Sequence, residues 1–123
     1  DEQVGFTRPW LEGSPYPPRI VLHIGEVEKL LPPMNLSIDL AFIDANKRQY
    51  VDYYNLLMPF IAPGGYILAD NTLWDGHVID PAYDRDAQTR GIRAFNDLVR
   101  DDERVEKVIL PLRDGLSLIR KIG

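Results

Sequence analysis

The chain has 123 residues, of which 45% are hydrophobic and 27% charged, and its formal net charge is -5. This length suits one globular domain, and the acidic charge disfavours nucleic acid as a partner because nucleic-acid-binding proteins usually gather Lys and Arg on one face. The absence of cysteine excludes disulfides and thiolate metal sites. We expect no membrane partner and a cytoplasmic location, because no apolar run approaches the roughly 20 residues of a membrane span and the first residues do not resemble a signal peptide.

The predicted elements begin with a helix over residues 1–14, although Pro9 is unfavourable in a helix interior. Short apolar runs rich in β-branched residues then predict three strands. Their near-continuous apolar character is typical of strands that are covered on both faces of a parallel sheet. The three runs are residues 19–24, 38–44 and 65–70.

Apolar residues recur at helical spacing over residues 47–62, and Pro63 and Gly64 are expected to stop this helix. A second amphipathic helix is predicted over residues 87–101. The tail, residues 105–122, holds two β-like runs around the short turn "RDG", which indicates an antiparallel hairpin. The sequence therefore predicts an α/β fold whose sheet is mostly parallel, with a C-terminal antiparallel hairpin.

Three oxygen-bearing side chains, Asp44, Asp70 and Asn71, follow two of the predicted strands. Ligands gather at the carboxyl ends of parallel strands, so these side chains are expected to converge there. Carboxylate and amide oxygens suit Mg²⁺, Mn²⁺ or Ca²⁺, and a cation between two carboxylates removes their repulsion. Taken singly, each residue is also a common cap of a turn or helix.

The segments "FIDANK" (residues 42–47) and "ADNTLW" (residues 69–74), in this order and spacing, resemble the cation-dependent class I O-methyltransferases. This family contains catechol O-methyltransferase and the caffeoyl-CoA O-methyltransferases. The resemblance runs from about Arg19 to Ile122 and includes the final "LPLRDGLSLIRK". It implies a Rossmann-like methyltransferase sheet, S-adenosylmethionine as methyl donor and a divalent cation, most readily Mg²⁺.

The resemblance also implies roles for individual residues. Asp44, Asp70 and Asn71 match the metal ligands, Lys47 matches the catalytic lysine, and Trp74 matches a residue near the acceptor pocket. A chelated cation would acidify a vicinal hydroxyl of the acceptor and orient it, while Lys47 would take its proton or stabilise the oxyanion. The implied acceptor is a small catechol-like or phenylpropanoid-like aromatic molecule.

For the methyl donor, the resemblance implies contacts from Gly25, Glu26 and Val27, which align with the segment that meets the adenine, and from Asp44. A complete enzyme of this type has a glycine-rich loop after its first strand, and the glycines of this chain form no such loop. Residues 1–123 are therefore expected to be one incomplete domain, the C-terminal portion. Its uncovered apolar edge favours pairing into a homodimer.

Two alternatives stay open at this point. One is a non-catalytic metal-binding or interaction fragment of the same fold, because the donor loop is absent from these residues. The other is a receiver-type signalling domain, since "IDLAFID" resembles a strand that ends in a phosphorylatable aspartate. The acidic pair and the lysine that a receiver domain also requires are not at the expected places.

Overall fold

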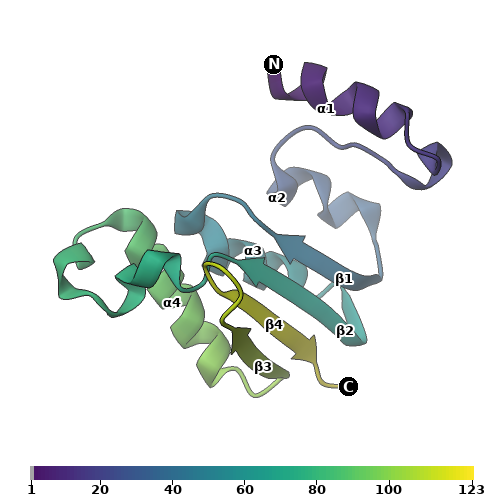
Figure 1. The fold of residues 1–123 in the computed structure, drawn as a ribbon. Helices are drawn as coiled ribbons and strands as arrows, with labels where there is room; N and C mark the ends of the chain where they lie inside the picture. Colours follow the sequence, from purple (N-terminus) through teal and green to yellow (C-terminus); the bar gives the residue numbers. More distant parts are fainter. Residues whose placement is uncertain (1) are drawn as a thin grey trace. The chain divides into compact units, whose positions relative to one another are not determined.

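A computed structural model describes residues 2–123, which divide into two compact units with a boundary between Met34 and Asn35. The first unit contains the predicted opening helix, in which the Gly13 N–H donates to the Pro9 carbonyl at 2.9 Å. None of the helices in the described part of the chain is long and apolar enough to cross a membrane. The helices of the first unit are α1 (Glu2–Glu12), η1 (Pro17–Arg19), α2 (Val27–Leu30) and η2 (Pro32–Met34) (Figure 1).

The strand predicted over residues 19–24 is wrong. Arg19 ends the short helix η1, and residues 20–24 form no strand and are exposed. A strand exists only where its backbone pairs with a neighbour, and residues 20–24 have no pairing partner among residues 2–123. An apolar, β-branched composition therefore does not by itself make this segment a strand.

The second unit is built on a four-stranded sheet with the order β1-β2-β4-β3 (Figure 1). Strands β1 and β2 are parallel, whereas β4 is antiparallel to both β2 and β3. The α/β class and the C-terminal hairpin are thus confirmed. The sequence predicts a mostly parallel sheet, but among the described residues the sheet is mixed, with one parallel and two antiparallel pairs, because the hairpin supplies two of its four strands. Its strands are β1 (Ile38–Ile43), β2 (Ile61–Asp70), β3 (Val105–Leu110) and β4 (Leu116–Lys121).

The helix predicted over residues 47–62 is present but shorter. It begins as η3 (Lys47–Gln49), continues as α3 (Tyr50–Leu57), and ends before Ile61. Residues 61–64 instead belong to β2, where one residue on β1 lies opposite four residues on β2 between the pairs Ile38–Ile61 and Leu40–Tyr66. This irregularity accommodates Pro63, which has no N–H to give to a regular ladder.

The second helix matches its prediction, since α4 spans Ala87–Asp101. It begins there because the Asp86 carboxylate accepts a hydrogen bond from the Thr89 N–H at 2.7 Å, which satisfies one of the free amides of the first turn. Two short helices lie in the loop between β2 and α4, namely η4 (Trp74–Ile79) and η5 (Pro81–Tyr83).

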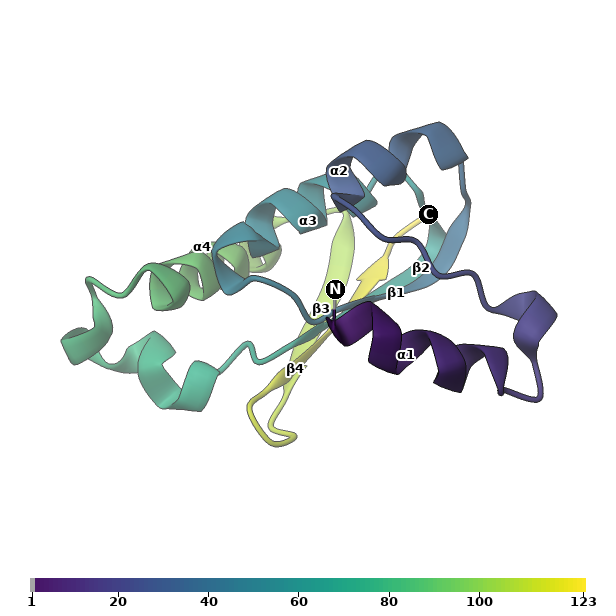
Figure 2. The same ribbon diagram turned by 90° about the horizontal axis from the view of Figure 1, so that it is seen from above.

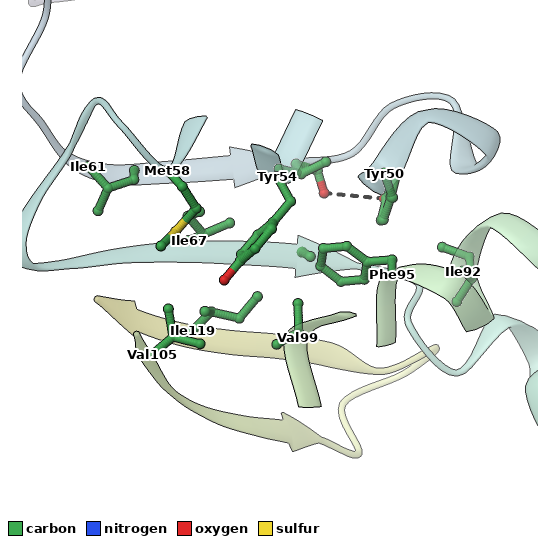
Figure 3. Close-up of a cluster of buried hydrophobic side chains, with 12 residues drawn as sticks. Tyr50, Tyr54, Met58, Ile61, Ile67, Ile92, Phe95, Val99, Val105 and Ile119 are labelled. Carbon is green, nitrogen blue, oxygen red and sulfur yellow. Dashed lines mark hydrogen bonds between the residues drawn. The ribbon is translucent and has the colours of Figure 1, made fainter. Parts of the chain in front are cut away.

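Helices α3 and α4 lie on the same face of the sheet (Figure 2), and the core forms between them and the strands (Figure 3). Phe95 packs edge-on against Tyr50 and Tyr54, with ring centroids 5.4 and 5.9 Å apart.

On β1, Leu40 and Phe42 are 59% and 60% exposed. Because side chains alternate along a strand, these two face away from the core, on the side without helices in this unit.

Candidate functional site

The predicted ligands lie at the ends of two paired strands, since Asp44 follows the last residue of β1 and Asp70 is the last residue of β2. Ile43 pairs with Ala69 in the parallel ladder, so Asp44 and Asp70 each come one residue after a paired position. Asp44 is exposed and Asp70 is half-buried. The sheet therefore brings the two acids to one edge, as parallel strands require.

Lys47 is a buried, positively charged side chain at this edge of the sheet, with only 7% of its surface exposed. Its Nζ donates to Asp44 Oδ1 at 3.0 Å and to the Tyr50 hydroxyl at 2.7 Å. The same nitrogen lies 5.9 Å from the centre of the Trp74 ring. Asp44 and Trp74, which come from two different predicted segments, thus both lie near the Lys47 ammonium group.

Tyr50 joins the two strand ends. Its hydroxyl lies 2.9 Å from the Asp70 carbonyl oxygen and 3.3 Å from that of Ile43, and it accepts a hydrogen bond from Lys47. Because Tyr50 is fully buried and anchored by Phe95, it fixes Lys47 against the strands. Sequence analysis missed this role, although the spacing of three residues from Lys47 places both side chains on one side of a helical turn.

The charges of this pair follow from their contacts. Burial alone would lower the pKa of Lys47, but its hydrogen bonds with Tyr50 and Asp44 outweigh burial and raise the pKa above its ordinary value. Burial raises the pKa of the Tyr50 phenol, and the hydrogen bond from Lys47 offsets part of this rise. Near neutral pH the pair is therefore an ammonium and a neutral phenol.

The backbone that carries Lys47 is held from the other side by α4. At Gly91, an added Cβ would lie 2.8 Å from the Arg48 Cα and would also collide with the Lys47 carbonyl oxygen. Only a glycine permits this approach between α4 and η3. Gly91 was not singled out from the sequence, because an isolated glycine within a helical pattern gives no sign of what faces it.

The segment after β2 has an unusual backbone. Asn71, Trp74 and Asp75 all have positive φ angles, of 62°, 48° and 51°. The turn between β3 and β4 holds this segment in place, because the Leu73 N–H donates to the Asp114 carbonyl at 2.9 Å and the Thr72 N–H donates to that of Gly115 at 3.2 Å.

Side chains secure the same segment. Asn71 Nδ2 donates to Asp114 Oδ2 at 3.3 Å, and the Asn71 N–H donates to Asp70 Oδ1 at 2.8 Å. Thr72 is fully buried, and its hydroxyl lies 2.9 Å from that of Ser117. Sequence analysis recognised Asp114 only as part of a turn, so its contact with Asn71 was missed.

The donor set fits a hard divalent cation in its chemistry. Among residues 2–123, no hydrogen-bond partner engages Asp44 Oδ2, Asp70 Oδ2 or Asn71 Oδ1, which leaves one carboxylate or amide oxygen free on each predicted ligand. The described residues contain no cluster of three His, Cys, Asp or Glu side chains suited to a metal. The predicted set has only two such side chains, and Asn71 supplies the third oxygen.

The predicted methyl-donor residues Gly25, Glu26 and Val27 lie in the first unit and are exposed there. Glu26 forms an ion pair with Lys29 and precedes the first residue of α2. Their contact with a methyl donor stays a prediction, as do the roles of Asp44, Lys47 and Trp74 towards donor and acceptor.

Comparison with known proteins places these observations in a family. The family model described as "O-methyltransferase" matches residues 2–122. The chain is 44% identical over 87 residues to a probable caffeoyl-CoA O-methyltransferase 1 of Dictyostelium discoideum, which covers 71% of this chain and 38% of that protein. It is 40% identical over 93 residues to caffeoyl-CoA O-methyltransferase 2 of Zea mays, covering 70% and 34% respectively.

Solved structures agree in fold. An O-methyltransferase from Bacillus cereus in complex with SAH superposes with a TM-score of 0.87 and 25% identity, over 98% of this chain and 59% of the other. A putative O-methyltransferase from Klebsiella pneumoniae gives a TM-score of 0.83 with 26% identity, over 99% and 57%. The chain thus spans little more than a third of the curated relatives reported above and somewhat over half of these structures.

Proposed function

Because the chain belongs to the O-methyltransferase family, we propose that it is part of an enzyme that transfers a methyl group from S-adenosylmethionine to a hydroxyl of a catechol-like or phenylpropanoid-like acceptor, with a divalent cation. The relatives named above support the acceptor class, since two are caffeoyl-CoA O-methyltransferases. The Bacillus cereus structure, which contains SAH, supports the donor. The cytoplasmic location and the homodimer are parts of the same proposal.

One observation carries the proposal, namely the buried Lys47 ammonium between Asp44 and Tyr50 at the strand ends. Lysine is almost never this buried unless it is paired, and a structural role alone would be filled as well by an apolar residue. A buried amine beside acids and free oxygens is the kind of arrangement that enzymes use for proton transfer and charge stabilisation.

In this proposal the residues divide the chemistry. Asp44, Asp70 and Asn71 would hold the cation, which when bound supplies positive charge that acidifies and orients the acceptor hydroxyl. The Lys47 ammonium stabilises the oxyanion that forms as the acidified hydroxyl releases its proton to solvent, and Tyr50 keeps the ammonium in place. Trp74 provides an apolar wall for an aromatic acceptor, and Gly25, Glu26 and Val27 form one side of the donor site.

The test uses the full natural chain with S-adenosylmethionine, Mg²⁺ and a catechol acceptor, and detects methylated product by mass spectrometry. We expect product that disappears when a chelator removes the cation. Lys47→Met should lower turnover by about 10²-fold or more, the scale for losing a positioned group that stabilises developing negative charge. Lys107→Met is the matched control, because Lys107 is exposed and its amine contacts the Asp102 carbonyl on the protein surface.

Two outcomes would contradict the proposal in different ways. Product formation that persists in the chelator would remove the cation from the reaction. Cation binding without methylation of any catechol or phenylpropanoid acceptor would favour the non-catalytic metal-binding alternative.

A further inference from the structure

Asp114 makes three contacts with the segment that follows β2, across 39 to 43 residues of sequence. Its Oδ2 accepts from Asn71 Nδ2, its Oδ1 accepts from the Asp75 N–H, and its carbonyl accepts from the Leu73 N–H. The turn that carries Asp114 has little freedom to shift, because a Cβ at the next residue, Gly115, would lie 2.8 Å from the Leu73 nitrogen.

The chemistry of this contact fixes the orientation of the Asn71 amide. An ionised carboxylate offers only acceptors, whereas an amide carries two N–H donors on one side and an acceptor oxygen on the other. Asp114 therefore binds the NH₂ side of Asn71 and leaves Oδ1 turned away from it. The Asn71 N–H contact with Asp70 Oδ1 holds the neighbouring carboxylate beside it.

We propose that Asp114 is a positioning residue that selects the amide orientation in which Asn71 offers its oxygen to the divalent cation. The inference rests on the proposed function, because it assigns Asn71 as a ligand. If the amide turned over, its NH₂ group would face the cation and could not coordinate it. Partners of this kind, which orient a ligand without touching the metal, typically change metal affinity by about 10-fold to 100-fold when they are replaced.

The test compares Asp114→Asn in two backgrounds, with Mn²⁺ affinity measured by calorimetry on the full natural chain. In the wild-type background, Asn at 114 can bind either side of the Asn71 amide, so affinity should fall by about 10-fold. In the Asn71→Asp background, both side-chain oxygens at position 71 can coordinate the cation, so no amide orientation is left to select. The same substitution should therefore lower Mn²⁺ affinity by a smaller factor there.

This difference between the two backgrounds separates positioning from a purely structural or electrostatic role. If Asp114 only braced the Asp75 N–H, or only added negative charge near the cation, Asp114→Asn would change the affinity by the same factor in both backgrounds. An isosteric Asn keeps the oxygen that accepts from that N–H. Melting temperatures without cation show that each variant is folded. Asp97→Asn is the matched control, because Asp97 is exposed and forms an ion pair with Arg100, and it should leave Mn²⁺ affinity unchanged.

The outcomes also separate this inference from the proposed function. Unchanged affinity of Asp114→Asn in the wild-type background, or an equal loss of affinity in both backgrounds, overturns the positioning role while Asn71 can still be a ligand. A wild-type chain that binds no Mn²⁺ overturns the cation site and the positioning role together.

Discussion

Gly91→Ala tests whether the packing of α4 against η3 sets the position of Lys47. The added Cβ would lie 2.8 Å from the Arg48 Cα and 3.0 Å from the Lys47 carbonyl carbon. Carbon atoms in contact prefer a separation of about 3.5 to 4.0 Å, so α4 and η3 must move apart by about 1 Å. The atoms met are backbone rather than the ends of flexible side chains, and rotamer changes cannot relieve the contact.

Two effects on stability oppose each other in this variant. Alanine is favoured over glycine within a helix by about 1 kcal/mol. Overpacking a filled site costs about 1 to 3 kcal/mol, and the upper part of this range applies because backbone atoms collide. We therefore expect a net loss of about 1 to 2 kcal/mol in the free energy of unfolding.

The effect on the site should be larger than the effect on stability. The two hydrogen bonds of Lys47 Nζ are 2.7 and 3.0 Å long, and a displacement of about 1 Å would break at least one of them. Misplacement of this size typically costs about 10²-fold in rate. Gly91 lies on α4 and is not one of the predicted ligands, so cation affinity should change little.

The assay combines urea unfolding with turnover of a catechol acceptor by the full natural chain. Gly5→Ala is the matched control, because Gly5 is also within a helix but an added Cβ meets nothing within 4 Å. That variant should gain up to about 1 kcal/mol and keep its turnover. A Gly91→Ala variant that is as stable and as active as the wild type would refute the packing argument.

Two further predictions concern the core. The hydrogen bond from Arg104 holds the pKa of Asp102 below its ordinary value, so the carboxylate stabilises the folded state above about pH 4 and this contribution is lost as the pH falls further. Urea unfolding at several pH values measures this: Asp102→Asn should lower the free energy of unfolding at neutral pH, and this free energy should then fall less steeply below about pH 4 than in the wild type. An equally steep fall in variant and wild type would contradict the prediction. Tyr50→Phe removes the hydroxyl that accepts from Lys47 and lies against the Asp70 carbonyl, so Lys47 keeps only its contact with Asp44 among the described residues and the free energy of unfolding should fall by about 1 to 3 kcal/mol. Equal urea midpoints for variant and wild type would contradict this.

The elements that could be predicted from the sequence are those whose pattern is local. The helix over residues 87–101 and the hairpin over residues 105–122 follow from spacing and turn residues that lie within each segment. The strand predicted over residues 19–24 has the same kind of local pattern and is absent. The difference is pairing, since a single segment of sequence does not report whether a neighbouring strand is present.

The end of α3 shows a second limit. Ile61 is apolar and continues the helical stripe from Tyr50, but it is buried from β2 rather than from a helix. An apolar residue that is buried in the core looks the same in the sequence whether it belongs to a helix or to a strand that packs on that core. Pro63 marks a true interruption, which turned out to be an irregular pairing within β2 rather than the end of a helix.

For the candidate site, the residues predicted from the sequence are those whose side chains would carry the proposed chemistry, such as Asp44 and Lys47. The residues that position them were missed, because Tyr50, Gly91 and Asp114 act through contacts that the sequence does not reveal. Asp114 is 43 residues from Asn71, and its role depends on how the hairpin folds back on the end of β2. Motifs identify reacting groups, whereas supporting contacts require the fold.

The presence of an asparagine rather than a second acid at position 71, directly after Asp70, has a physical explanation. Asn71 has a φ of 62°, and asparagine tolerates this left-handed conformation better than most residues. A carboxylate at position 71 would lie about as close to Asp114 as the amide does, at 3.3 Å, and the two charges would repel by about 5 kcal/mol at an effective dielectric constant of 20. The amide can donate to Asp114 and still turn an oxygen outward, so it meets the demands of the backbone, the hairpin and the proposed cation at one position.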